Sequence, residues 1–127
     1  MENNLKQELT LLSRAIAKVH KGLLHFQKEI YEEEKGKKLT VHEFLHLTMT
    51  DSDFEWLKLL STLIVQIDEA VDDDDSKLPE LKKEVLVELR TLFVDPSQNL
   101  DFKARIIQAL GKDSTIWLDI SELRKQL

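Results

Sequence analysis

The sequence predicts an all-α fold, a single-domain helical bundle of five or six helices over residues 1–127. Apolar residues recur three and four positions apart along most of the chain, the spacing that places side chains on one face of a helix. Only 3 Gly and 2 Pro interrupt this pattern, so the helices should be long and the loops short. No segment shows the alternation of a strand, and 127 residues suit one domain with a sizeable core.

The strongest periodic segment predicts one long N-terminal helix from Leu5 to Lys35. Asn4 can cap its start, and Gly36 among lysines is a suitable stop. Such a helix, about 45 Å long, either kinks near Gly22 or projects beyond the bundle. The heptad spacing of its apolar strip fits a seam within the bundle better than a coiled-coil seam with a partner. Because the strip exceeds what the later helices should cover, we also expect a homodimer formed through this helix. The strip consists of Leu5, Leu9, Leu12, Ile16, Val19, Leu23, Phe26 and Ile30.

The next part of the chain predicts a helical corner and then a central helix. Thr40 and Glu43 have the spacing of a capping box, which should start a short helix of about nine residues. Ser52 and Glu55 form a second box at the start of a central helix over residues 53–72. The apolar residues of this helix cover a wide arc, so other helices should pack around it.

Three further helices should close the bundle. The acidic run from Asp72 to Asp75 predicts a solvated loop, because it lacks the glycine and the alternating ligands of a calcium-binding loop. One helix should start near Pro79 and end at the next proline. A shorter one should close at Gly111, and the last should run over residues 116–127.

The apolar faces of these helices together predict one core. Neither an internal repeat nor a linker long enough to divide domains is present. The residues expected in the core are Leu12, Ile16, Val19, Leu23, Phe44, Leu57, Leu60, Ile64, Ile67, Leu89, Ile106 and Ile120.

Composition limits the classes of function. There is no Cys, which excludes thiolate metal sites and suits a reducing compartment. The sequence has neither a signal-peptide pattern nor an apolar run near the ~20 residues of a membrane span, so we expect a cytoplasmic protein without a membrane partner. A net charge of −6 opposes nucleic acid unless the cations share a face, and we expect them to be scattered.

One motif suggests metal chemistry. His42-Glu43-x-x-His46 matches H-E-x-x-H, in which two histidines on one helix face bind zinc and the glutamate activates a water. Glu69 and Asp73 resemble the E-x-x-x-D of gluzincin metalloproteases, which would make Glu69 the third ligand. Against this, so short a motif arises by chance, Glu43 serves in a capping box, and no strand is present to bind an extended substrate. We therefore expect surface histidines and no cofactor.

Two other motifs are weaker. Glu43 and His46 also form the E-x-x-H of di-iron bundles, but such bundles need a second copy of it, which this chain lacks. Arg14 and His20 have the R-x5-H spacing that resembles HEPN ribonucleases, where the motif lies on a late helix rather than on the first. Neither pattern assigns a catalytic residue.

A ligand pocket is a further candidate. Trp56, Asp68 and Glu69 lie on or beside the predicted central helix, and only four Arg are available to pair with the two acids. A buried Asp68 would need a cation or several hydrogen-bond donors, whereas an Asp68 facing an open pocket would mark a ligand site.

A pattern of core residues carries a family resemblance. It comprises Tyr31, Glu32, Gly36, Phe44, Leu45, Asp51, Phe54, Trp56, Leu57, Leu60, Ser61, Leu63, Ile64, Ile67, Asp68 and Glu69, with further similarity over residues 102–127. In these positions the chain resembles a family of small all-helical bacterial proteins of unassigned function. The resemblance implies a bacterial, cytoplasmic helical protein and no particular activity.

These observations favour a non-enzymatic protein-interaction or regulatory module whose partner is itself or another protein. The alternative is a metal-dependent hydrolase built on His42, Glu43 and His46.

Overall fold

The computed structural model describes residues 2–73 and 76–127, and every regular element within them is a helix. This confirms the all-α bundle. Of the predicted acidic loop, Asp72 ends a helix, and Asp74 and Asp75 lie outside the described residues. The elements are α1 (Glu2–Lys35), α2 (Val41–Thr50), the 3-10 helix η1 (Ser52–Leu57), α3 (Lys58–Asp72), α4 (Leu78–Phe93), α5 (Leu100–Lys112) and α6 (Ile116–Arg124).

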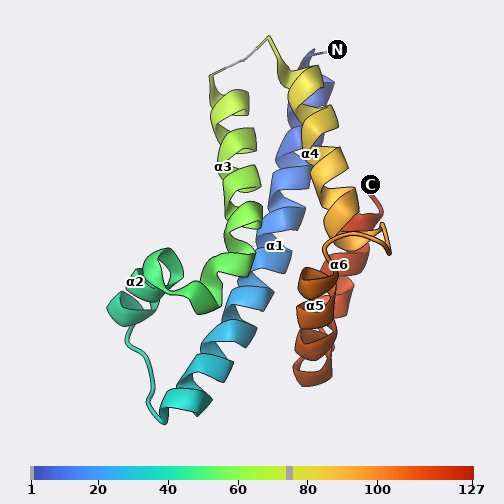
Figure 1. The fold of residues 1–127 in the computed structure, drawn as a ribbon. Helices are drawn as coiled ribbons and strands as arrows, with labels where there is room; N and C mark the ends of the chain where they lie inside the picture. The colour runs from blue at the N-terminus through green and yellow to red at the C-terminus, as the bar shows by residue number, and fades with distance from the viewer. Residues whose placement is uncertain (1, 74–75) are drawn as a thin grey trace.

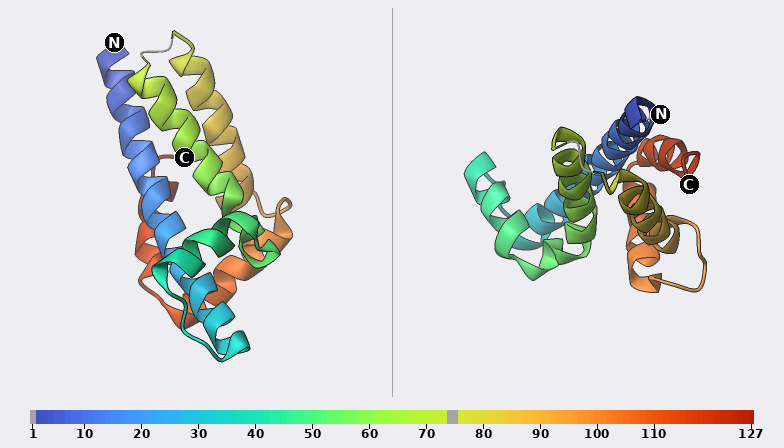
Figure 2. Two further views of the ribbon diagram at one scale, coloured as in Figure 1. Left: turned by 90° about the vertical axis from the view of Figure 1, so that its left-hand side faces the viewer. Right: turned by 90° about the horizontal axis from the view of Figure 1, so that it is seen from above.

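The other helices are arranged around α1. Its most extensive contacts are with α3 and α6, and it also touches α4, α5 and η1. Helix α3 lies on one side of α1, α4 to α6 lie on the other, and α2 stands apart beside the start of α3 (Figures 1 and 2). The predicted segment 53–72 is helical throughout, but α1 occupies the centre because its apolar face is long enough for several neighbours.

Helix α1 runs without interruption through Gly22. A Cβ at Gly22 would lie 3.2 Å from Cγ1 of Ile116, so the absent side chain allows α6 to pack closely against α1. The C-terminal end of α1 extends past the start of α3 and leads into the loop before α2 (Figure 1). Of the two alternatives predicted for this helix, the projecting end is the one observed.

The first predicted capping box forms and the second does not. Thr40 and Glu43 exchange two hydrogen bonds, from the Thr40 N–H to Oε1 at 3.1 Å and from the Glu43 N–H to Oγ1 at 3.2 Å. The box predicted at Ser52 is wrong: Asp51 is the N-cap, and its carboxylate accepts from the Asp53 N–H at 2.8 Å. The predicted central helix therefore begins as the 3-10 helix η1, which leads directly into α3.

Of the two predicted glycine stops, one is confirmed. Gly36 ends α1 with φ at 64°, in the left-handed region that glycine adopts without strain. Gly111 does not end a helix but lies inside α5, which is followed by an extended Asp113. The last helix ends at Arg124, short of the predicted Leu127, because the final residues turn instead.

Most of the predicted core is buried: Leu12, Ile16, Val19, Leu23, Leu57, Leu60, Ile67, Leu89 and Ile120. Ile64 and Ile106 are only partly buried, at the edge of this core. Phe44 is also partly buried because it lies on the peripheral α2, where its ring meets that of Phe54 at 5.9 Å. Phe54 itself is enclosed, although it was absent from the prediction.

Two buried polar side chains on α1 are paired across the bundle. Ser13 Oγ donates to the Asp68 carboxylate on α3 at 2.7 Å, and Gln27 Oε1 accepts from Trp56 Nε1 of η1 at 3.0 Å. Among the described side chains, no buried nitrogen or oxygen atom lacks a hydrogen-bond partner. These pairs fix the register of α1 against α3 and η1.

Replacement of Ile67 by alanine should lower the free energy of unfolding by about 2–5 kcal/mol, because its enclosed side chain leaves a cavity. Val65 lies on the same helix and is 52% exposed, so Val65→Ala should change it by less than about 0.5 kcal/mol. Urea denaturation measures both. Equal effects of the two substitutions would mean that α3 is rotated relative to this description.

Candidate functional site

The H-E-x-x-H residues lie on α2, and both histidines are exposed. Glu43 is occupied by the capping box and by Lys37, whose Nζ lies 2.6 Å from Oε2. The hydrogen bond from Lys37, followed by those from Thr40, lowers the pKa of Glu43 to about 2. A carboxylate held so strongly in the ionised form is a poor general base for water.

The predicted third ligand is not brought to the two histidines. Glu69 lies near the C-terminal end of α3, beside residues of α4 that include Glu80 and Glu84. Helix α2 stands next to the opposite end of α3 (Figure 1). In the part of the chain that the structure describes, no three His, Asp or Glu side chains are grouped so that they could hold a metal ion.

The structure gives Trp56, Asp68 and Glu69 different neighbours. Trp56 packs on the Phe102 ring at 5.5 Å, with the Arg105 guanidinium 5.5 Å from the indole. Asp68 lies about three turns further along the chain, is exposed, and accepts the Ser13 hydrogen bond described above. The acid is therefore paired without being enclosed.

The R-x5-H pair also separates. Arg14 and His20 lie on α1 and line two different hollows. Arg14 is exposed, whereas His20 is half-buried, and burial lowers its pKa. The neutral imidazole is thus favoured, but the arginine is not beside it.

An exposed apolar stripe runs along α2. Val41, Leu45 and Met49, spaced four residues apart, are 74%, 55% and 74% exposed. The opposite face of α2 is held against the bundle by Phe44 and Leu47, and no residue of the helix is fully buried. Four-residue spacing keeps the three side chains on one face, so the most outlying helix carries a continuous apolar strip in solvent.

A groove follows the outer face of α1. One hollow of about 520 Å³ lies between α1, Phe44 of α2 and two aspartates of the α5–α6 region, Asp113 and Asp119. A second, of about 700 Å³, continues towards the N-terminus of α1 and shares Lys18 and Asp119 with the first. The first hollow therefore has α2 on one side and α6 on the other. The second lies between α1, α4 and α6, and the paired Glu8 and Lys82 are in its lining.

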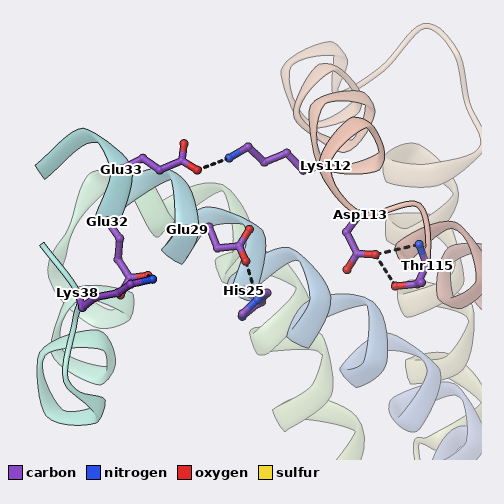
Figure 3. Close-up of polar contacts among 8 residues, drawn as sticks. All are labelled: His25, Glu29, Glu32, Glu33, Lys38, Lys112, Asp113 and Thr115. Atoms are coloured by element: carbon purple, nitrogen blue, oxygen red, sulfur yellow. Dashed lines mark hydrogen bonds and ion pairs between the residues drawn. The ribbon is translucent and has the colours of Figure 1, made fainter. Parts of the chain in front are cut away.

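Polar contacts brace the end of this groove (Figure 3). Lys112 at the end of α5 pairs with Glu33 of α1 at 2.7 Å, and His25 lies 2.9 Å from Glu29. The side chain of Asp113 accepts hydrogen bonds from the N–H and the hydroxyl of Thr115, which lower the pKa of Asp113. The end of α5 is thereby linked to α1, and Asp113 holds the turn that leads into α6.

Four of the 18 Lys and Arg residues of the chain share one face of α1, together with His25. They recur at spacings of four and three residues along its outer face: Arg14, Lys18, Lys21, His25 and Lys28. We call these five residues the cationic row. The sequence carries a signal for this row, because its members have the same three-four spacing as the apolar strip.

No described helix is long and apolar enough to cross a membrane. Comparison of the chain with protein-family models, with curated proteins and with solved structures finds no match.

The pKa of Glu43, followed by NMR titration of its carboxyl group, should be about 2, and Lys37→Ala should raise it towards the ordinary value of 4.5. Because the folded-state pKa is lowered, the capping contacts stabilise the fold above about pH 4.5. That stabilisation should be lost as the pH falls through about 2. An unchanged pKa in the Lys37 variant would refute the assigned cause.

Purified protein should carry less than stoichiometric zinc, iron or manganese. His42→Ala and His46→Ala should leave metal content unchanged and alter stability by less than about 0.5 kcal/mol, because both side chains are exposed. Elemental analysis and thermal unfolding measure these quantities. One equivalent of tightly held metal that disappears in either variant would make the hydrolase the leading hypothesis.

Proposed function

We propose that this protein is a non-enzymatic protein-interaction module that presents α2 to its partner. The observation that carries the proposal is the outward stripe of Val41, Leu45 and Met49 on a helix that buries none of its residues. Complete burial of one such side chain contributes roughly 1.5–3 kcal/mol. Three neighbouring side chains on one face could thus provide the apolar centre of an interface.

The stripe is also held in place before any partner arrives. The Thr40 capping box fixes the first turn of α2, and the Asp51 N–H bonds to the Leu47 carbonyl at its last turn. Phe44 lies against the buried Phe54 from the inner face. A helix that is already formed loses less conformational entropy on binding, which favours α2 as a recognition element.

The hydrolase alternative has less support. It requires a third ligand near His42 and His46 and an available base, whereas Glu69 belongs to another surface and Glu43 is engaged with Lys37. A cytoplasmic, bacterial setting is part of our proposal and is supported by the cysteine-free composition and by the family resemblance of the core residues.

The apolar strip of α1 no longer supports a homodimer formed through this helix. The residues from Leu9 to Phe26 in that strip are buried against other helices of the same chain. The surface of α1 that remains exposed includes the cationic row, and two copies of that row would repel each other. Homodimer formation is therefore a proposal only through α2, beside the alternative of a different protein as partner.

A photoreactive amino acid in place of Leu45 should form a discrete covalent adduct with a protein when illuminated in the native host. The same residue in place of Val65 is the matched control, since the two positions are 55% and 52% exposed. An adduct of twice the chain mass would identify a second copy as the partner. Equal labelling from both positions would contradict the proposal, because it would show only random collisions.

A further inference from the structure

The cationic row lies opposite the apolar seam of α1. Each member follows a buried seam residue by two positions, as Lys18 follows Ile16 and Lys21 follows Val19. Two positions correspond to about 200° around a helix of 3.6 residues per turn. The inner side of α1 is thus mainly apolar, apart from Ser13 and Gln27, and the row on its outer side is about 21 Å long, at ~1.5 Å per residue.

Three members of the row are free to bind another group. Arg14, Lys18 and Lys21 are exposed and make no ion pair or hydrogen bond with any side chain that the structure describes. Other lysines of the same protein are paired, such as Lys82 with Glu8 at 2.6 Å. Unpaired cations in a row are unfavourably close to one another, and an opposing row of carboxylates would relieve this repulsion.

The row borders a concave surface with an apolar component. Leu24 and Phe44 line the hollow towards α2, and Leu11, which is 56% exposed, lines the hollow towards the N-terminus of α1. The ammonium group of Lys28 lies 5.4 Å from the centre of the Phe44 ring, where charge and apolar surface meet. An occupant therefore needs an apolar strip next to an acidic one.

We propose that this groove binds an amphipathic helix of a partner protein whose acidic flank faces the cationic row. The inference rests on the proposed function and names the chemistry of the partner. A helix fits because four turns, about 21 Å, match the row, and because residues three and four apart supply both strips on adjacent faces.

The opposite wall of the groove argues against other occupants. Asp113, Asp119 and Glu122 line it, so a phosphate backbone or an anionic lipid surface would meet carboxylates within the same concavity. A second copy would bring its own α1 cations and be repelled. These acids also orient the partner helix, whose second flank should be neutral or basic.

Fluorescence anisotropy with the whole protein tests the groove. The probe is a labelled amphipathic peptide of about 18 residues, or five turns, with one leucine strip, one glutamate flank and one alanine flank. A control peptide has lysine in place of each glutamate. The acidic peptide should bind at least roughly tenfold more tightly than the lysine peptide, and added salt should weaken its binding.

The double variant Lys18→Glu/Lys21→Glu should bind the acidic peptide at least roughly tenfold more weakly than the unmodified protein does. The control variant Lys58→Glu/Arg124→Glu changes the net charge by the same amount at exposed positions outside the groove. It should weaken binding of the acidic peptide by less than about twofold. All four positions are exposed, so both variants should fold, as circular dichroism and thermal unfolding would verify.

The proposal is overturned if the two double variants lose affinity for the acidic peptide equally. It is likewise overturned if the unmodified protein binds the acidic and the lysine peptide with equal affinity. It is also overturned if single-stranded RNA or phosphatidylserine vesicles bind the groove more tightly than the acidic peptide. The Leu45 adduct separates the two proposals. If that adduct persists while the acidic peptide fails, the groove assignment is wrong and the proposed function stands.

Discussion

The apolar seam of α1 is the constraint on which the rest of the structure depends. Leu9, Ile16, Val19 and Leu23 are completely enclosed, although a single straight helix cannot enclose any of them by itself. Their burial requires α3 on one side and α6 on the other, and Gly22 allows α6 to approach closely enough to complete it. Because this burial is the main source of stability, the positions of α3 to α6 follow from it.

The same constraint explains what remains outside. Neighbours that cover the inner side of α1 cannot also cover its outer side, so Lys18 and Lys21 remain in solvent beside a groove. Helix α2 follows the projecting end of α1, beyond the reach of α4, and so has only η1 as a substantial neighbour. The surfaces that we assign to binding are therefore those that the packing of one long helix leaves uncovered.

The presence of each helix was predictable, because burial of one helix face requires apolar residues three and four positions apart. The sequence shows this spacing, for example from Leu5 to Ile30. The exact residues at which helices begin and end were less predictable. Asp51 and Ser52 are both good N-cap residues, and the backbone conformation at Asp51 determines which of them caps the helix. Phe44 has the pattern of a core residue, yet periodicity identifies an apolar face without saying how much covers it. The groove could not be predicted, since Phe44 and Asp119 meet α1 only through tertiary packing.

The central claim is that stability resides in the seam of α1 and that α2 is a formed but peripheral helix. Amide hydrogen exchange of the free protein tests this most directly, because it reports the free energy of opening residue by residue. Amides from Leu12 to Leu23 should exchange only through global unfolding, whereas those from Leu45 to Thr50 should exchange through local opening at much lower free energy. Protection of α2 equal to that of α1 would contradict the account.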